Sequence, residues 1–274
     1  MPTPGRHAGA PGAPSITSFC VARSVVIFDL DDTLVEEEQT AHSSFNEVAR
    51  RLHMADSDRT GTAIRDAVRR VWHSGPHYDL CLELGIASWE GLWATFEGNH
   101  PVLDGVKSWV PIYRREAWRT ALDAVSLDLD LAQLAHDVFV EAQSWGHHLL
   151  EGAGQTVSEL SDRFRLALLT NGPSDIQRRK LEGTGLTSRF ESLSISGETG
   201  VGKPTPAAFA DVLSKLNVRP EDAVMVGDSW ERDVTGAVSS GLFAVWIASG
   251  RPAPEQMERV VVIDSIDELV SVLP

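Results

Sequence analysis

The chain has 274 residues, of which 42% are apolar and 23% are charged, as in an ordinary globular protein. Its 39 acidic residues outnumber 24 lysines and arginines, and the formal net charge of -15 disfavours nucleic acid as a partner because phosphate backbones would be repelled. No stretch reaches the roughly 18 consecutive apolar residues of a membrane span, so no membrane association is predicted.

Residues 1–23 are rich in proline, glycine and serine and predict a disordered leader. This segment lacks the apolar stretch of a secretion signal, although its lack of acidic residues leaves an organelle transit peptide open. Cys20 and Cys81 have no neighbouring metal-ligand pattern, which favours a reduced, cytoplasmic protein.

The rest of the chain predicts an α/β fold with a helical insertion. Residues 25–28, VVIF, read as a buried parallel strand, and residues 41–146 then change to long helical segments with no convincing strand. Helices and strands alternate afterwards, with strands expected at 165–170, 190–195, 223–227, 243–247 and 259–264. We therefore predict a Rossmann-like, doubly wound parallel core from residues 24–40 and 147–274, with residues 41–146 as an all-helical cap domain over its active edge.

Polar side chains follow four of the predicted strands. They are Asp29-Leu30-Asp31-Asp32-Thr33, Thr170-Asn171-Gly172, Lys203, and Gly227-Asp228-Ser229 with Asp233. The carboxyl ends of parallel strands meet at one edge of a sheet, where open α/β folds bind ligands.

The clustered carboxylates predict a magnesium site. Carboxylates brought close together repel one another unless a cation lies between them, and ligands that are all oxygen favour Mg²⁺. With Mg²⁺ held by Asp29 and Asp228, a phosphate group could share the metal, while Lys203 and the Thr170 hydroxyl neutralise its other oxygens. One carboxylate is then free to attack phosphorus, and Asp31 is placed to transfer protons.

These residues resemble the motifs of the haloacid-dehalogenase-like superfamily of hydrolases, in its phosphatase branch with a C1-type helical cap. The matching segments are FDLDDTL at 28–34, LLTNG at 168–172, GKPTPAAF with its lysine, and VGDSWERD at 226–233. The resemblance implies these roles: Asp29 as nucleophile and metal ligand, Asp31 as general acid/base with its backbone carbonyl on the metal, Thr170, Asn171 and Lys203 on the phosphate, Asp228 as a metal ligand, and Asp233 acting through water or by orienting its neighbours.

The implied activity is Mg²⁺-dependent hydrolysis of a small phosphorylated metabolite, such as a sugar phosphate, an acyl-sugar phosphate or a nucleotide, through an aspartyl-phosphate on Asp29. A phosphomutase of the same fold and a non-catalytic binding module stay open, as does the oligomeric state. Residues 197–204, GETGVGKP, resemble a nucleotide-binding P-loop, but Pro204 stands where that loop needs Ser or Thr.

The cap holds further residues to which a role could be given. Its histidines and tryptophans are expected to be solvated or core residues. Arg114, Arg115 and Arg119 are kept as candidates for binding a substrate carboxylate or second phosphate.

Overall fold

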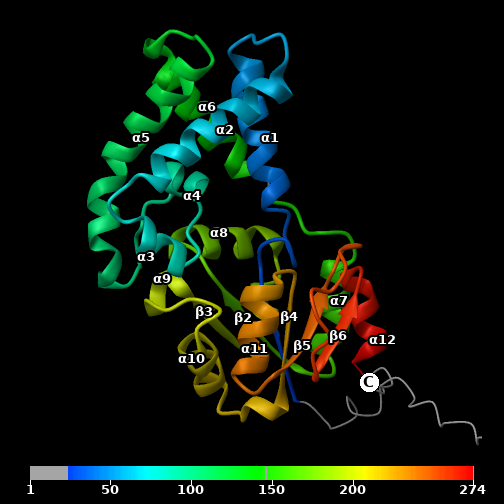
Figure 1. The fold of residues 1–274 in the computed structure, drawn as a ribbon. Helices are drawn as coiled ribbons and strands as arrows, with labels where there is room; N and C mark the ends of the chain where they lie inside the picture. The colour runs from blue at the N-terminus through cyan, green and yellow to red at the C-terminus, as the bar shows by residue number, and fades with distance from the viewer. Residues whose placement is uncertain (1–23, 146, 274) are drawn as a thin grey trace, which may run out of the picture.

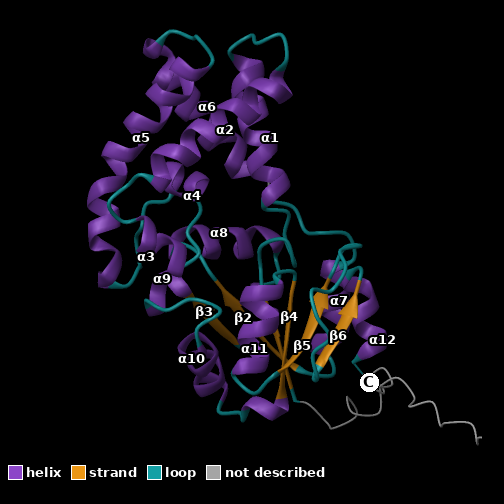
Figure 2. Ribbon diagram, viewed as in Figure 1, coloured by secondary structure: helices purple, strands orange, loops and turns teal. Residues whose placement is uncertain are grey.

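A six-stranded parallel sheet forms the centre of the computed structural model, which describes residues 24–145 and 147–273 (Figures 1 and 2). The strand order is β3-β2-β1-β4-β5-β6. The strands are β1 (Val25–Phe28), β2 (Arg165–Thr170), β3 (Ser192–Ile195), β4 (Ala223–Gly227), β5 (Phe243–Ile247) and β6 (Val260–Ile263). All six predicted strands and the doubly wound α/β fold are confirmed, while the predicted leader lies outside the described residues.

The central strand β1 pairs in parallel with β2 on one side and with β4 on the other. Its last residue, Phe28, stands level with Leu168 of β2 and Val226 of β4. The chain order reverses between β1 and β4, which creates the crevice where ligands bind in open α/β sheets. The segments that follow these strands therefore meet at one edge of the sheet.

Helices cover both faces of the sheet. One face packs against α7 (Ala153–Ser161), α8 (Ser174–Thr184) and α12 (Leu269–Val272), and the other against α10 (Pro206–Leu216) and α11 (Gly236–Ser239). A short helix, α9 (Ser196–Thr199), follows β3. Burial on both faces explains why the central strands β1 and β4 read as continuous apolar runs.

The helical insertion lies between β1 and β2 and rises above the carboxyl edge of the sheet (Figure 1). Its helices are α1 (Glu38–Arg51), α2 (Ser57–His73), α3 (Tyr78–Glu83), α4 (Ser88–Trp93), α5 (Asp104–Ala124) and α6 (Ala132–Trp145). It has its own core, in which the rings of Phe45 and Phe139 lie 4.7 Å apart and Trp72 is buried. Ile176 of α8 joins this cluster, so apolar packing fastens the insertion to the sheet layer.

Two details of the insertion differ from the prediction. The sequence predicts long helical segments, whereas α3 and α4 have six residues each and α4 ends at Trp93. Phe96 and Gly98 adopt positive φ values of 57° and 72°, which a right-handed helix cannot contain. Within the described part of the chain, no helix is long and apolar enough to cross a membrane.

Candidate active site

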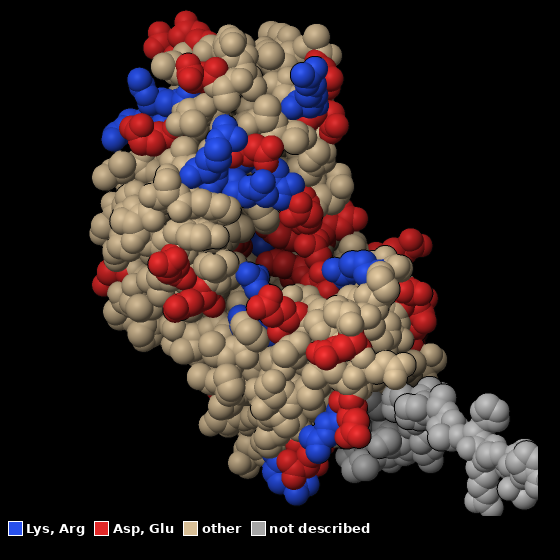
Figure 3. Space-filling model, in the orientation of Figure 1, with Lys and Arg blue, Asp and Glu red and all other residues tan. Residues whose placement is uncertain are grey.

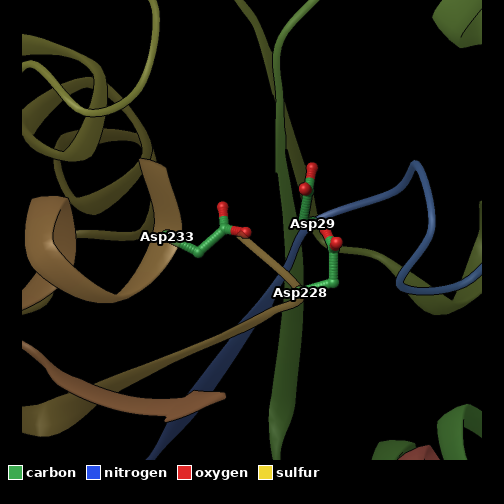
Figure 4. A group of neighbouring side chains, drawn as sticks. All are labelled: Asp29, Asp228 and Asp233. Carbon is green, nitrogen blue, oxygen red and sulfur yellow. The ribbon is translucent and has the colours of Figure 1, made fainter. Parts of the chain in front are cut away.

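Three carboxylates converge at the crevice between β1 and β4 (Figure 4). Asp29 follows β1, Asp228 follows β4, and Asp233 lies in the π-helical segment Trp230–Thr235. One oxygen from each lies within 4.8 Å of the others. We call these residues the aspartate triad; the parallel register of β1 and β4 brings its first two members together.

Lys203 binds two members of the triad. Its Nζ atom lies 2.7 Å from Asp29 Oδ1 and 2.6 Å from Asp233 Oδ1, and the side chain is buried. Asn171 fixes the lysine backbone: its Nδ2 donates to Lys203 O at 2.9 Å, and Lys203 N donates to Asn171 Oδ1 at 2.9 Å. Both polar atoms of the Asn171 side chain are thereby occupied, and its backbone carbonyl accepts from Gln177 Nε2 at 2.9 Å.

The triad carries more negative charge than Lys203 can neutralise. Burial raises the pKa of Asp29, the charge of Asp233 raises it further, and Lys203 opposes both effects. Burial, with Asp233 and Asp32 nearby, also raises the pKa of Asp228 to about 7. A divalent cation would relieve this repulsion, and the all-oxygen donor set fits Mg²⁺.

Asp233 reaches the triad because β4 ends in a glycine. A Cβ atom on Gly227 would lie 2.2 Å from Asp233 Oδ2, closer than any side chain allows. The same oxygen accepts a hydrogen bond from Ser229 N at 3.0 Å. Thr33 Oγ1 accepts one from Asp228 N at 3.1 Å and so joins the first motif to the last.

Asp31 and Thr170 lie on the α8 side of the crevice, apart from the triad. Gln177 Nε2 donates to Asp31 Oδ2 at 2.9 Å and to Thr170 Oγ1 at 2.7 Å. Lys180 Nζ lies 2.9 Å from Asp31 Oδ1. Burial raises the pKa of Asp31, and the lysine opposes that shift.

Sequence reasoning missed Lys180 and its partners. The buried ammonium also lies 2.7 Å from Glu37 Oε2 and 3.5 Å from Glu90 Oε1. His147 Nε2 lies 2.9 Å from Glu37 Oε2, and Trp89 Nε1 donates to Glu37 Oε1 at 2.6 Å. One clue was available: Lys180 follows Ile176 by four residues and precedes Leu181, so it falls on the buried face of α8.

The two glutamates respond to this setting in opposite ways. Burial raises the pKa of Glu90 to about 8, because Lys180 only partly offsets the loss of water and the nearby carboxylates add to the effect. Burial also acts to raise the pKa of Glu37, but Lys180 and His147 outweigh it and lower that pKa to about 2.

A cavity of about 390 Å³ opens between the insertion and the triad. Figure 3 shows it as a hollow lined with acidic side chains between the two lobes. Asp29, Asp31 and Lys203 line it from the sheet, and Tyr78 lines it from α3. The candidate arginines 114, 115 and 119 are not among its lining residues.

Two alternatives from the sequence find little support in the structure. The Arg114 side chain donates instead to the backbone carbonyl of Gly91, at 3.1 Å. The P-loop-like segment contains α9, and its Lys203 ammonium is occupied by carboxylates of the triad.

Comparison with known proteins identifies the family. The haloacid dehalogenase-like hydrolases match residues 24–241. The chain belongs to this family. The resemblance carried by the four motifs is thus confirmed, and the helical insertion between β1 and β2 agrees with the C1-type cap.

Two relatives of this hydrolase are named phosphatases. The phosphoserine phosphatase of Thermus thermophilus is 33% identical over 228 residues, which cover 82% of this chain and 89% of the relative. The N-acylneuraminate-9-phosphatase of Mus musculus is 34% identical over 174 residues, covering 58% and 70%. Among solved structures, the magnesium-bound HAD-hydrolase YfnB of Bacillus subtilis has a TM-score of 0.66 at 20% identity and covers 92% of this chain and 99% of that one.

Proposed function

We propose that this hydrolase cleaves small phosphate monoesters with the help of Mg²⁺, using Asp29 as the nucleophile. The observation that carries the proposal is the aspartate triad with Lys203, buried at the crevice of the sheet. The two relatives named as phosphatases support the same reaction class.

The residues divide the proposed reaction into two steps. In the first, an Asp29 oxygen attacks phosphorus, the bond from phosphorus to the ester oxygen breaks, and Asp31 gives its proton to the departing alcohol. In the second, Asp31 takes a proton from water, whose oxygen attacks the aspartyl-phosphate and releases inorganic phosphate and the Asp29 carboxylate. Lys203, the Thr170 hydroxyl and the Asn171 backbone bind the phosphate oxygens.

Asp29, Asp228 and the backbone carbonyl of Asp31 are the proposed metal ligands. A bound Mg²⁺ would supply positive charge between the carboxylates and the phosphate, so that two anions can approach each other. Asp233 acts through its neighbours, because its oxygens already accept from Lys203 and Ser229.

The helical insertion is the proposed cap domain, spanning residues 41–146, with the core formed by 24–40 and 147–274. We place hinges near residues 35–41 and 146–152, so that closure excludes water while Asp29 is phosphorylated. The cavity of about 390 Å³ fits a small metabolite. Within the described residues, the Arg232 guanidinium that lines it has no ion-pair partner and offers a contact for a substrate anion.

The test is phosphate release from a panel of sugar phosphates, nucleotides and small phosphorylated acids, with Mg²⁺ and with EDTA. We expect release of inorganic phosphate from at least one compound class and none in EDTA. A phosphate group moved within the substrate without release would instead support a phosphomutase. Mg²⁺ binding with no turnover across the panel would support a binding module.

A further inference from the structure

Lys180 brings an ammonium group into the interior between the insertion and the sheet layer. Its side chain is 0% exposed. The Nζ atom lies near oxygens of three carboxylates: 2.9 Å from Asp31, 2.7 Å from Glu37 and 3.5 Å from Glu90. A buried ammonium is costly unless opposite charges compensate it, so these carboxylates are what allow the lysine to be buried.

The three carboxylates come from different parts of the chain. Asp31 belongs to the loop after β1, Glu37 directly precedes α1 where the chain enters the insertion, and Glu90 lies on α4 inside the insertion. Glu37 also contacts His147, on the segment that returns to the core. Through these contacts Lys180 joins α8 to the loop after β1, to the two connections of the insertion and to α4. Figure 1 shows α8 between the sheet and the insertion.

Among the residues that the structure describes, the donors to the Asp31 carboxylate come from α8. Lys180 contacts Oδ1 and Gln177 donates to Oδ2, each at 2.9 Å. The two donors are three residues apart and so lie on one face of the helix. The Asp31 side chain keeps 23% of its surface exposed and lines the cavity, where a leaving group would be.

We propose that Lys180 is a positioning residue that holds Asp31 in the orientation for proton transfer, and that it does so fully only while Glu90 keeps α4 seated on α8. The inference rests on the proposed phosphatase function. Lys180 forms no ion pair with the aspartate triad, so it acts through Asp31 and not on the nucleophile. Proton transfer thereby depends on whether the insertion is packed against α8.

The test compares two leaving groups in the full chain with Mg²⁺. An alkyl phosphate needs a proton on its leaving oxygen, whereas p-nitrophenyl phosphate barely does. We expect Lys180→Met to lower kcat about 100-fold on the alkyl phosphate and about 10-fold or less on p-nitrophenyl phosphate. Lys180→Arg should recover part of the loss. Lys215→Met, which removes an exposed lysine paired with Asp211, should leave the ratio of the two rates unchanged.

Equal loss on both substrates would reduce Lys180 to a structural residue and overturn the inference. The Asp31→Asn variant gives a second check. Because it has no Asp31 carboxyl group for Lys180 to position, adding Lys180→Met to it should change the ratio of the two rates little further. If Lys180→Met alone does not fold, the pair Lys180→Met with Glu37→Gln removes one charge of each sign and is expected to show the same selective loss. An unchanged ratio in that pair would also overturn the inference.

Glu90→Leu tests the link to the insertion, since it removes the oxygen that faces Lys180 and keeps most of the side-chain volume. We expect faster amide hydrogen exchange in α4. We also expect the ratio of kcat on the alkyl phosphate to kcat on p-nitrophenyl phosphate to fall about two- to fivefold. If neither changes, the link to α4 is wrong. Failure of the wild-type chain to release phosphate from every compound of the panel and from both of these substrates would refute the proposed function. Activity with an unchanged ratio in the Lys180 variants refutes only this inference.

Discussion

Asp29 has its Oδ1 atom engaged by two donors, Lys203 Nζ and Leu30 N, each at 2.7 Å. Two donors on one oxygen fix the rotation of the carboxylate without using the other oxygen. Lys203 also stabilises the charged form of Asp29, which is the form that can attack phosphorus. Asp29 is thus held by the backbone of the next residue and by a lysine from a distant segment of the chain, and that lysine opposes the rise in pKa that burial causes.

Asp29→Asn is expected to lower kcat at least about 1,000-fold, because an amide cannot form the acyl-phosphate. Phosphate release from the best substrate of the panel measures the loss, and far-UV circular dichroism checks the fold. Asp211→Asn, at a half-buried aspartate on α10 that pairs with Lys215 away from the site, is the matched control and should keep full activity. A variant at position 29 with a tenth of the wild-type kcat would exclude Asp29 as nucleophile.

Glu90 should make the stability of the fold depend on pH. Its pKa is about 8 in the folded chain against 4.5 for an ordinary glutamate, so the folded state retains the proton that the unfolded state releases. Stability from this group is complete below about pH 4.5 and is lost as pH rises through 8. We expect the free energy of unfolding of Glu90→Gln, relative to wild type, to rise by about 1–3 kcal/mol between pH 5 and pH 8.5.

Urea unfolding in EDTA at several pH values measures this difference. Glu97→Gln, which replaces an exposed glutamate of the same insertion, is the matched control. A difference for Glu90→Gln that is constant across the range would show that Glu90 is ionised in the folded chain.

At the scale of elements, the end of β4 and the π-helical segment Trp230–Thr235 act as one unit. The strand must end in a residue without a side chain, since Asp233 occupies the space of a Gly227 Cβ atom. π-Helical turns are rare in proteins and occur mainly at functional sites. Here the turn carries Asp233 back over the strand end, next to Lys203.

Gly227→Ala is therefore expected to destabilise the chain by about 2–4 kcal/mol and to lower turnover, because Asp233 must move away from Lys203. Thermal unfolding and phosphate release check both effects. Gly183→Ala is the matched control: a Cβ atom there meets nothing within 4 Å inside α8, so the change should be neutral or slightly stabilising. Equal stability of the two variants would show that β4 tolerates a side chain.

At the scale of the whole molecule, two separately packed parts share one acidic crevice. The insertion and the sheet have distinct apolar cores. The two parts meet at Ile176 and at Lys180 with its carboxylate partners. With a net charge of -15, the chain concentrates negative charge at this junction, as Figure 3 shows for the hollow between the lobes. A cation bound there should stabilise the folded chain, because the unfolded chain does not assemble the triad.

Mg²⁺ at about 100 times its dissociation constant is expected to raise Tm by about 5 °C or more relative to EDTA. Differential scanning fluorimetry measures the shift. Asp228→Asn should remove most of it, because one of the two proposed side-chain ligands is lost. NaCl at equal ionic strength controls for general screening of the acidic surface, and a NaCl shift as large as that of Mg²⁺ would argue against a specific site.

Local patterns in the sequence determined the strands, the helical character of the insertion and the family, because apolar runs, helical periodicity and motif residues act within a few positions of each other. Asp29 and Asp228 were expected to meet since both follow parallel strands. Only the tertiary structure decided that Lys180 collects Asp31, Glu37 and Glu90. Those ion pairs depend on how the insertion sits on α8, and neither residue spacing nor periodicity specifies that placement.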